Sequence, residues 1–251
     1  MKSILVLKHI AYESPGFIQE FLDAKDLDYA VLDLNKGMKL PPPETCRLAV
    51  SLGGPMSVND DYAFLQRERI FLQECVRRGT TVLGVCLGAQ MLASALGARV
   101  FANPQKEIGH FTVELTSHGL HDGLFEGFNR GFPVFQWHGE TFRIPRGARK
   151  LASSRLCINQ AFRRGNAYGL QFHLEVSAGM VEDWTHQYAT ELKQLRVDAE
   201  EIILEARRLE PTYRELTHKL MINLLQLVDV TRHERIRLRR IVSRRRQPPV
   251  A

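Results

Sequence analysis

The sequence contains few cysteines and no arrangement of them that is typical of a metal site. Its four cysteines, at positions 46, 75, 86 and 157, form neither a CxxC pair nor a Cys/His zinc spacing. The short apolar run ILVL near the N-terminus lacks a signal-peptide cleavage site, so we expect free thiols in a reducing cytoplasm. Three of the four thiols are expected to have no chemical role, and no metal or cofactor is predicted.

Long apolar runs and a phosphate-binding loop are also missing. No apolar stretch approaches the roughly 18 residues that a membrane span requires, so we predict no transmembrane helix. The motif GxxxxGK followed by Ser or Thr, which cradles nucleotide phosphates, does not occur. With 251 residues, 44% of them hydrophobic, the chain is long enough for one sizeable core and a small appendage.

Excess positive charge is confined to one segment. Residues 232–246 contain eight arginines and one glutamate, or +7, whereas the whole chain carries +6, which leaves −1 for the remainder. We expect this tail to be disordered and solvated; contact with nucleic acid, an acidic partner or membrane phosphate is the alternative. The basic pI therefore does not predict nucleic acid as a partner of the main domain.

In the first hundred residues, apolar runs typical of buried strands alternate with apolar residues at helical spacing. Near-continuous apolar runs predict strands at 3–7, 28–34, 47–54 and 80–86, and helical spacing predicts helices at 15–24, 64–79 and 88–98. This alternation indicates an α/β fold with a parallel sheet covered on both faces. Residues 100–172 read as short extended pieces between turns, and the chain after residue 177 reads as successive helices, with a break at the proline in LEPTY.

Cys86 lies where a predicted strand meets a predicted helix, in the sequence LGVCLGAQ. The pattern Gly84-x-Cys86-x-Gly88 is that of a nucleophile elbow, whose small flanking residues allow a tight turn. Such a turn exposes the side chain at the carboxyl edge of the sheet, and the positive end of the following helix favours a thiolate. A buried cysteine at an ordinary strand–helix turn is the alternative.

Two further stretches supply the groups that a thiolate nucleophile needs. In YGLQFHLEVS, His173 and Glu175 are two residues apart on an apparent strand and share one face, so the carboxylate can orient the imidazole. In SLGGPMSVND, the turn Gly53-Gly54-Pro55 can present a backbone N–H to a developing oxyanion, with the N–H of Leu87 as the second donor.

Taken together, GGP, GVCLGAQ and QFHLE resemble the motifs of the class I, or triad, glutamine amidotransferases over about residues 1–185. The chain is most similar to the glutaminase domain of GMP synthase and its stand-alone relatives. The resemblance implies a flavodoxin-like three-layer sandwich with a mostly parallel central sheet. It also implies Cys86 as nucleophile, His173 as base, Glu175 as orienter, and Gly54 and Leu87 as the oxyanion hole.

The same resemblance marks a glutamine pocket. Gln90 and Gly53 are expected beside the substrate, and Trp137, His138 and Gly139 of FQWHGE are expected to line its α-amino and carboxylate end. Core packing with a satisfied imidazole is the alternative for Trp137 and His138. Glu107 is either a substrate contact or a solvated charge.

We divide the chain into an amidotransferase domain over residues 1–190 and a helical extension over 191–251. The implied reaction is hydrolysis of glutamine to glutamate and ammonia through a γ-glutamyl thioester. The sixty residues after 190 are too few for a synthetase domain, so a separate ammonia-accepting synthetase is expected as a partner. The alternatives are a free-standing hydrolase of γ-glutamyl peptides or conjugates, and a non-catalytic binding protein on the same scaffold. A homo-oligomer formed through the apolar C-terminal helices also remains open.

Overall fold

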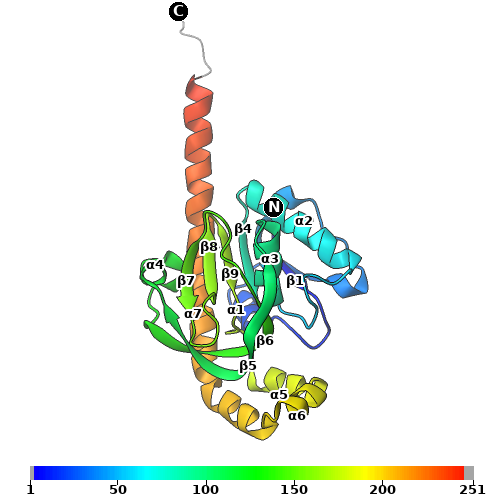
Figure 1. The fold of residues 1–251 in the computed structure, drawn as a ribbon. Coiled ribbons are helices and arrows are strands. Elements are labelled where there is room, and N and C mark those ends of the chain that lie inside the picture. Colours follow the sequence, from blue (N-terminus) through cyan, green and yellow to red (C-terminus); the bar gives the residue numbers. More distant parts are fainter. Residues whose placement is uncertain (1–2, 246–251) are drawn as a thin grey trace, which may run out of the picture.

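A computed structural model describes residues 3–245 of the chain, and the side chains of residues 3–228. Its centre is one nine-stranded sheet with the strand order β2-β1-β3-β4-β9-β8-β7-β5-β6 (Figure 1). Helices cover both faces of this sheet, so the fold is the three-layer α/β sandwich that the sequence predicts.

The first five strands in this order are parallel and form the half of the sheet that positions the site. They are rich in β-branched and aliphatic residues, and the central ones are buried on both faces, as parallel strands require. Their bounds are β2 (Tyr29–Asp33), β1 (Ser3–Lys8), β3 (Cys46–Ser51), β4 (Thr81–Val85) and β9 (Ala167–Leu170).

The other four strands are antiparallel. The predicted short extended pieces are found in β7 and β8, but for β5 and β6 the prediction was wrong. β5 and β6 are long strands that pair along most of their length, with Ile108 opposite Trp137. Turn-forming residues inside β5, such as Asn103 and Pro104, suggested an interruption, but the register merely shifts between Ala102 and Glu107. The four strands are β8 (Ala161–Arg164), β7 (Arg149–Ser153), β5 (Val100–Leu115) and β6 (Gly131–Phe142).

The helices form two layers, each with its own apolar core. Residues of α2 and α3 pack on one face of the sheet, and residues of α1, α5 and α7 pack on the other. The helices are α1 (Gly16–Ala24), α2 (Ala63–Arg77), α3 (Leu87–Ala95), α4 (Ser117–Leu120), α5 (Ala178–Gln187), α6 (Ala189–Leu195) and α7 (Ala199–Arg245), with short 3-10 turns at Leu34–Lys36, Pro43–Thr45 and Gly123–Phe125.

α7 runs through Pro211, where the sequence predicted a break. An internal proline costs a helix about 3 kcal/mol. The buried side chains of Leu209, Tyr213 and Leu216 hold the helix on both sides of the proline, and burying each contributes about 1.5–3 kcal/mol. Tertiary packing therefore outweighs the local preference for a break.

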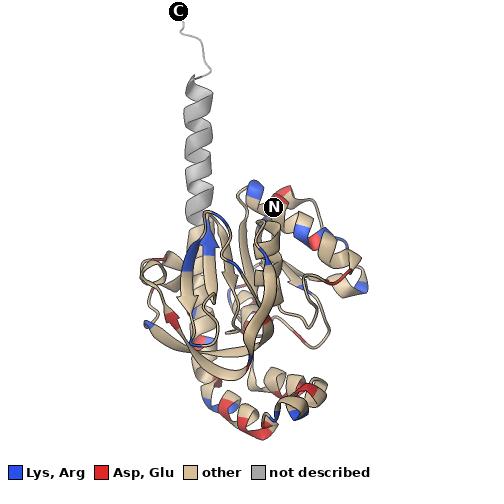
Figure 2. Ribbon diagram, viewed as in Figure 1, with Lys and Arg blue, Asp and Glu red and all other residues tan. Residues whose placement is uncertain are grey.

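The side chains of α7 up to Val228 join the same core as α1 and α5. The domain division at residue 190 remains a prediction. The disorder predicted for the arginine-rich tail (232–246) remains a prediction, since the structure describes no side chain beyond residue 228. On the face seen in Figure 2, basic and acidic residues alternate along α2 and the start of α7, in keeping with a nearly neutral main domain. Among the described helices, none is long and apolar enough to cross a membrane.

Candidate active site

Cys86 lies directly between β4 and α3 in a conformation that side chains rarely adopt. Its backbone has φ 51° and ψ −109°, and it is the N-cap of α3. A positive φ outside glycine costs on the order of 1–3 kcal/mol and is typical of functional sites. The turn is held because the Cys86 N–H donates to the carbonyl of Leu170 on β9, 2.8 Å away. The predicted nucleophile elbow is therefore present at the carboxyl edge of the sheet.

The two glycines flanking Cys86 are required by backbone packing. A Cβ added at Gly84 would lie well inside 3.0 Å of the backbone of Gly88. A Cβ added at Gly88 would meet the carbonyl oxygen of Ser51 equally closely, and the Gly88 N–H donates to the Leu52 carbonyl at 2.9 Å. The helix that follows Cys86 thus crosses the end of β3 in direct backbone contact.

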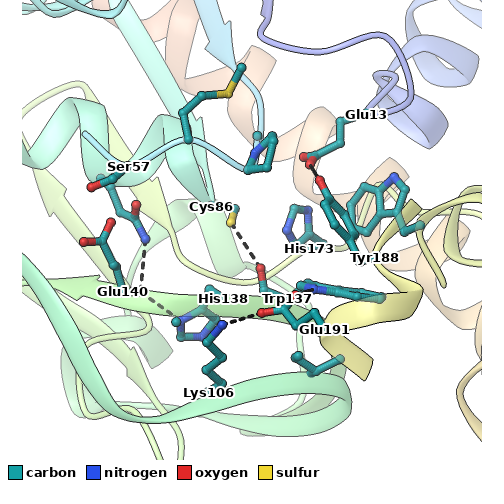
Figure 3. A pocket seen from close by; sticks show the side chains of 17 residues that line it. Glu13, Ser57, Cys86, Lys106, Trp137, His138, Glu140, His173, Tyr188 and Glu191 are labelled. Atoms are coloured by element: carbon teal, nitrogen blue, oxygen red, sulfur yellow. Dashed lines mark hydrogen bonds and ion pairs between the residues drawn. The ribbon is translucent and has the colours of Figure 1, made fainter. Parts of the chain in front are cut away.

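His173 lies beside Cys86 (Figure 3). Its imidazole Nδ1 and the Glu175 carboxylate are 2.6 Å apart, and the ring also interacts with the Cys86 sulfur. His173 is fixed by a backbone bridge to Phe135 of β6, and Thr217 of α7 donates to the Leu174 carbonyl at 2.7 Å. The three side chains are therefore held by elements from three regions of the chain.

The neighbours of His173 shift the pKa of its imidazole. Burial by itself lowers the pKa of this imidazole, but the carboxylate of Glu175 and the sulfur of Cys86 outweigh burial and raise its pKa well above the usual value. The sulfur also lies 3.9 Å from the carbonyl oxygen of Trp137 and 3.8 Å from the amide nitrogen of Gln171.

The loop after β3 passes close to the sulfur, as the oxyanion-hole prediction requires. A Cβ on Gly53 would lie 3.0 Å from Cε1 of His173 and 3.7 Å from Cβ of Cys86, so only glycine brings the backbone this near. Gly54 lines the same cavity as Cys86. Within residues 3–228, the N–H groups of Gly54 and Leu87 donate no hydrogen bond, which leaves both available to a ligand.

A cavity of about 410 Å³ opens beside Cys86, and four of the predicted pocket residues line it. Gln90 donates to the Glu140 carbonyl at 3.0 Å, and the indole of Trp137 donates to Glu191 at 3.0 Å. Gly139 completes this wall, where an added Cβ would meet the Lys106 side chain at 3.0 Å.

His138 also lines the cavity, but both of its ring nitrogens have protein partners. Nδ1 lies 2.9 Å from the Glu140 carbonyl, and Nε2 lies 3.0 Å from Glu107. Glu107 is fully buried and also accepts from Ser154 and Gln160, so it is not the solvated charge that was one of its two expected roles. These residues form a hydrogen-bonded wall behind the pocket.

The Glu107 and His138 ligand atoms lie within 4.8 Å of one another and of the Cys157 sulfur, a grouping that could offer three ligands to a metal. The carboxylate already has three protein partners, in His138, Ser154 and Gln160. The absence of a metal or cofactor from the reaction remains a prediction.

Several pocket residues escaped the sequence analysis, and Glu13 is the most important. It follows β1 at the carboxyl edge of the sheet, is buried, and accepts a hydrogen bond from Tyr188 at 3.2 Å. Burial raises the pKa of Glu13 to about 7, although the nearby charge of His173 opposes the shift. Its position after a parallel strand could have marked Glu13 as a site residue in the sequence, because open α/β sheets bind ligands at the carboxyl ends of their strands. Tyr188, Trp184 and Glu191 lie on the late helices, and no local pattern marked them.

Comparison with known proteins agrees with this geometry. The model of the family "Glutamine amidotransferase class-I" matches residues 31–184. The glutamine amidotransferase-like protein YfeJ of Salmonella typhimurium is 32% identical over 181 residues, which are 69% of this chain and 76% of YfeJ.

A glutamine amidotransferase structure from Thermotoga maritima has a TM-score of 0.83 and 35% sequence identity, and covers 89% of this chain and 98% of its own. GMP synthase of Chlorobium phaeovibrioides is 32% identical over 57% of this chain, but the match spans only 32% of that enzyme's length. With its Cys-His-Glu site assembled at the predicted position, the chain belongs to the class I glutamine amidotransferase family.

Proposed function

We propose that the protein hydrolyses the γ-carboxamide of glutamine to glutamate and ammonia. The observation that carries this proposal is the geometry of Cys86 at the start of α3, with His173 bridging its sulfur and Glu175. This arrangement is that of a nucleophile, a general base and an orienting carboxylate. Family membership and the glutamine amidotransferase names of the relatives support glutamine as the substrate.

The reaction begins when the Cys86 thiolate attacks the carboxamide carbon. The carbonyl π electrons move to the oxygen, which is stabilised by the N–H groups of Gly54 and Leu87. The tetrahedral adduct collapses, the C–N bond breaks, and the imidazolium of His173 gives its proton to the departing ammonia. A γ-glutamyl thioester remains on the sulfur. His173 then takes a proton from water, and the hydroxide displaces the thiolate to release glutamate.

The pocket places the substrate for this attack. Gln90, Trp137, His138 and Gly139 line the side of the cavity proposed to hold the amino-acid end of glutamine. Hydrogen bonds to the Glu140 carbonyl and the Glu191 carboxylate hold this wall in place before substrate enters, which lowers the cost of ordering on binding. Gly53 leaves room beside the sulfur.

A second candidate, hydrolysis of γ-glutamyl peptides, is favoured by the shape of the cavity. The cavity extends past Cys86 to Glu13, Trp184 and Tyr188, on the side where His173 lies (Figure 3). The general acid must face the leaving group, so this part of the cavity would hold whatever amine departs. This part of the cavity has room for a leaving group larger than ammonia, with side chains to contact it.

The fate of the ammonia is a separate proposal. The chain spans about a third of the length of the GMP synthase that it matches. A synthetase that accepts the ammonia is the partner proposed for a glutaminase of this kind. A homo-oligomer and a cytoplasmic location remain predictions.

The test is glutamate release by the purified protein, measured on glutamine and on a panel of γ-glutamyl dipeptides. Cys86→Ala is the blank, and Cys75→Ala, which removes a buried thiol of α2, is the matched control. We expect release that requires Cys86 and survives Cys75→Ala, and hydroxylamine added to the assay should trap the thioester as γ-glutamyl hydroxamate. Faster turnover of a dipeptide than of glutamine would select the second candidate. Release that persists in Cys86→Ala would remove the cysteine mechanism.

A further inference from the structure

A second buried polar network lies beneath the loop that carries Gly53 and Gly54. The Ser51 hydroxyl donates to Glu68 at 2.7 Å, and the other oxygen of Glu68 lies 2.7 Å from Nε2 of His9. Nδ1 of His9 lies 2.9 Å from the carbonyl oxygen of Gly53. All three side chains are inaccessible to solvent. The network thus runs from α2 through the end of β1 to the backbone of the glycine loop.

The hydrogen-bond chemistry fixes which atoms carry protons. A backbone carbonyl only accepts, so Nδ1 of His9 must donate to Gly53. Glu68 accepts from Ser51 on one oxygen, and a proton joins its other oxygen to Nε2 of His9. Burial alone would lower the pKa of His9, but the Glu68 carboxylate outweighs burial and raises it.

We propose that Ser51, Glu68 and His9 are positioning residues that hold the Gly53–Gly54 peptide with its N–H directed at the oxyanion. This inference rests on the oxyanion hole of the proposed function. The described chain contains no cis peptide bond, so the Gly54 N–H points away from the Gly53 carbonyl and hence away from His9. The loop borders the site, since a Cβ added at Gly53 would lie well inside 3.0 Å of Glu13 Oε2, 3.0 Å from Cε1 of His173 and 3.7 Å from Cβ of Cys86.

The network also polarises the peptide whose N–H serves the oxyanion. Glu68 holds the His9 ring, and Nδ1–H of His9 donates to the Gly53 carbonyl of that peptide. A donor on the carbonyl polarises the amide and strengthens the hydrogen bond that its N–H donates on the other side. The donor of the hole is thereby aligned before substrate arrives, which is the condition for efficient electrostatic stabilisation.

A purely structural role explains this network less well. Replacing a buried ion pair by apolar side chains of similar size is often neutral or stabilising, so stability alone does not require ionic groups here. Apolar side chains in place of His9 and Glu68 would fill the same space, but none would donate to the Gly53 carbonyl. The Gly53 carbonyl and the Ser51 hydroxyl are the two groups that depend on the polar side chains, and only the first belongs to the peptide of the oxyanion hole.

Two double variants test whether His9 and Glu68 align the Gly53–Gly54 peptide or only fill space in the core. His9→Leu with Glu68→Met fills the space but removes the donor to Gly53, and it leaves no buried unpaired charge. His9→Asn with Glu68→Gln is equally neutral, and the asparagine amide nitrogen takes the position of Nδ1 and keeps the donor. Each is compared with the wild type by kcat and KM for the γ-glutamyl substrate that it turns over fastest, after circular dichroism has shown that it is folded.

We expect the apolar pair to lose about 10- to 100-fold in kcat with KM unchanged, because an oxyanion donor acts in the transition state. The donor-retaining pair should recover most of this loss. The rate at which iodoacetamide alkylates Cys86 should be the same in all three proteins, since that displacement develops no oxyanion.

Equal kcat values for the two double variants, or wild-type kcat in the apolar pair, would overturn the inference and leave the proposed function intact. A parallel fall in the alkylation rate would show that the network supports the site as a whole, and would equally overturn it. A wild type that turns over no γ-glutamyl substrate would remove the proposed function, and this inference with it.

Discussion

Glu13 gives the protein a stability that depends on pH in a direction opposite to that of most carboxylates. Its side chain is buried between the glycine loop and Tyr188, so the charged form is disfavoured in the folded state. The positive charges of His173 and His9 lower the pKa and the charge of Glu175 raises it, but burial dominates. The folded protein therefore binds a proton at Glu13 more tightly than the unfolded chain does.

The magnitude follows from the pKa in the two states. Burial raises the pKa of Glu13 from 4.5 to about 7. At 1.36 kcal/mol per pH unit, this difference removes about 3 kcal/mol of unfolding free energy in total. Because the folded pKa is the higher one, the stability is present below pH 4.5 and is lost as the pH rises to 7. Between pH 5 and pH 8 the loss is about 2.5 kcal/mol.

Glu13→Gln abolishes this dependence, because the amide imitates the protonated carboxyl and still accepts from Tyr188. Urea unfolding of both proteins at pH 5 and pH 8 measures the effect. We expect the variant to be more stable than the wild type at pH 8, by about 2–3 kcal/mol more than at pH 5. Glu215→Gln, at an exposed position on α7, is the control and should show no such difference. Parallel pH dependences for Glu13→Gln and the wild type would refute the argument from burial.

Two further predictions concern the triad and the elbow. Glu175→Gln should lower kcat by about 10²- to 10⁴-fold with a smaller change in KM, because an amide beside Nδ1 of His173 no longer holds the ring in the productive tautomer. Steady-state glutamate release measures kcat and KM, and a loss of kcat below tenfold would contradict this role of Glu175. Gly88→Ala should destabilise the fold by at least about 1–3 kcal/mol in urea unfolding, because its Cβ would meet the Ser51 carbonyl. Gly179→Ala in α5, where a Cβ meets only a hydroxyl at 3.9 Å, should instead be neutral or stabilising by up to about 1 kcal/mol.

The sequence was most informative where the structure is local. Strands and helices of the first hundred residues alternate with clear periods, and the elements found there match the predicted ones to within a few residues. The turn at Cys86 could be predicted because two glycines flank a single reactive residue. His173 and Glu175 could be paired because residues two apart on an extended chain share a face. Each inference needed only a few consecutive residues.

The rest of the site depends on contacts between distant segments. Glu13 meets Tyr188 across most of the chain, and nothing near either residue indicates that contact. His9 and Glu68, separated by 59 positions, become partners because β1 lies beside β3 and α2 packs on the same sheet. A buried carboxylate looks in sequence like any solvated one, since burial is a property of the packed molecule.

The sequence by itself determined the parallel half of the sheet, the tight turn at Cys86 and the pairing of His173 with Glu175. Only the tertiary structure decided that α7 continues through Pro211 and that β5 and β6 form one long pair. It alone also decided that the side chains of Glu13 and His9 are buried away from solvent. Hydrophobic period and turn chemistry act over a few residues, whereas packing and desolvation depend on every segment that meets at a point.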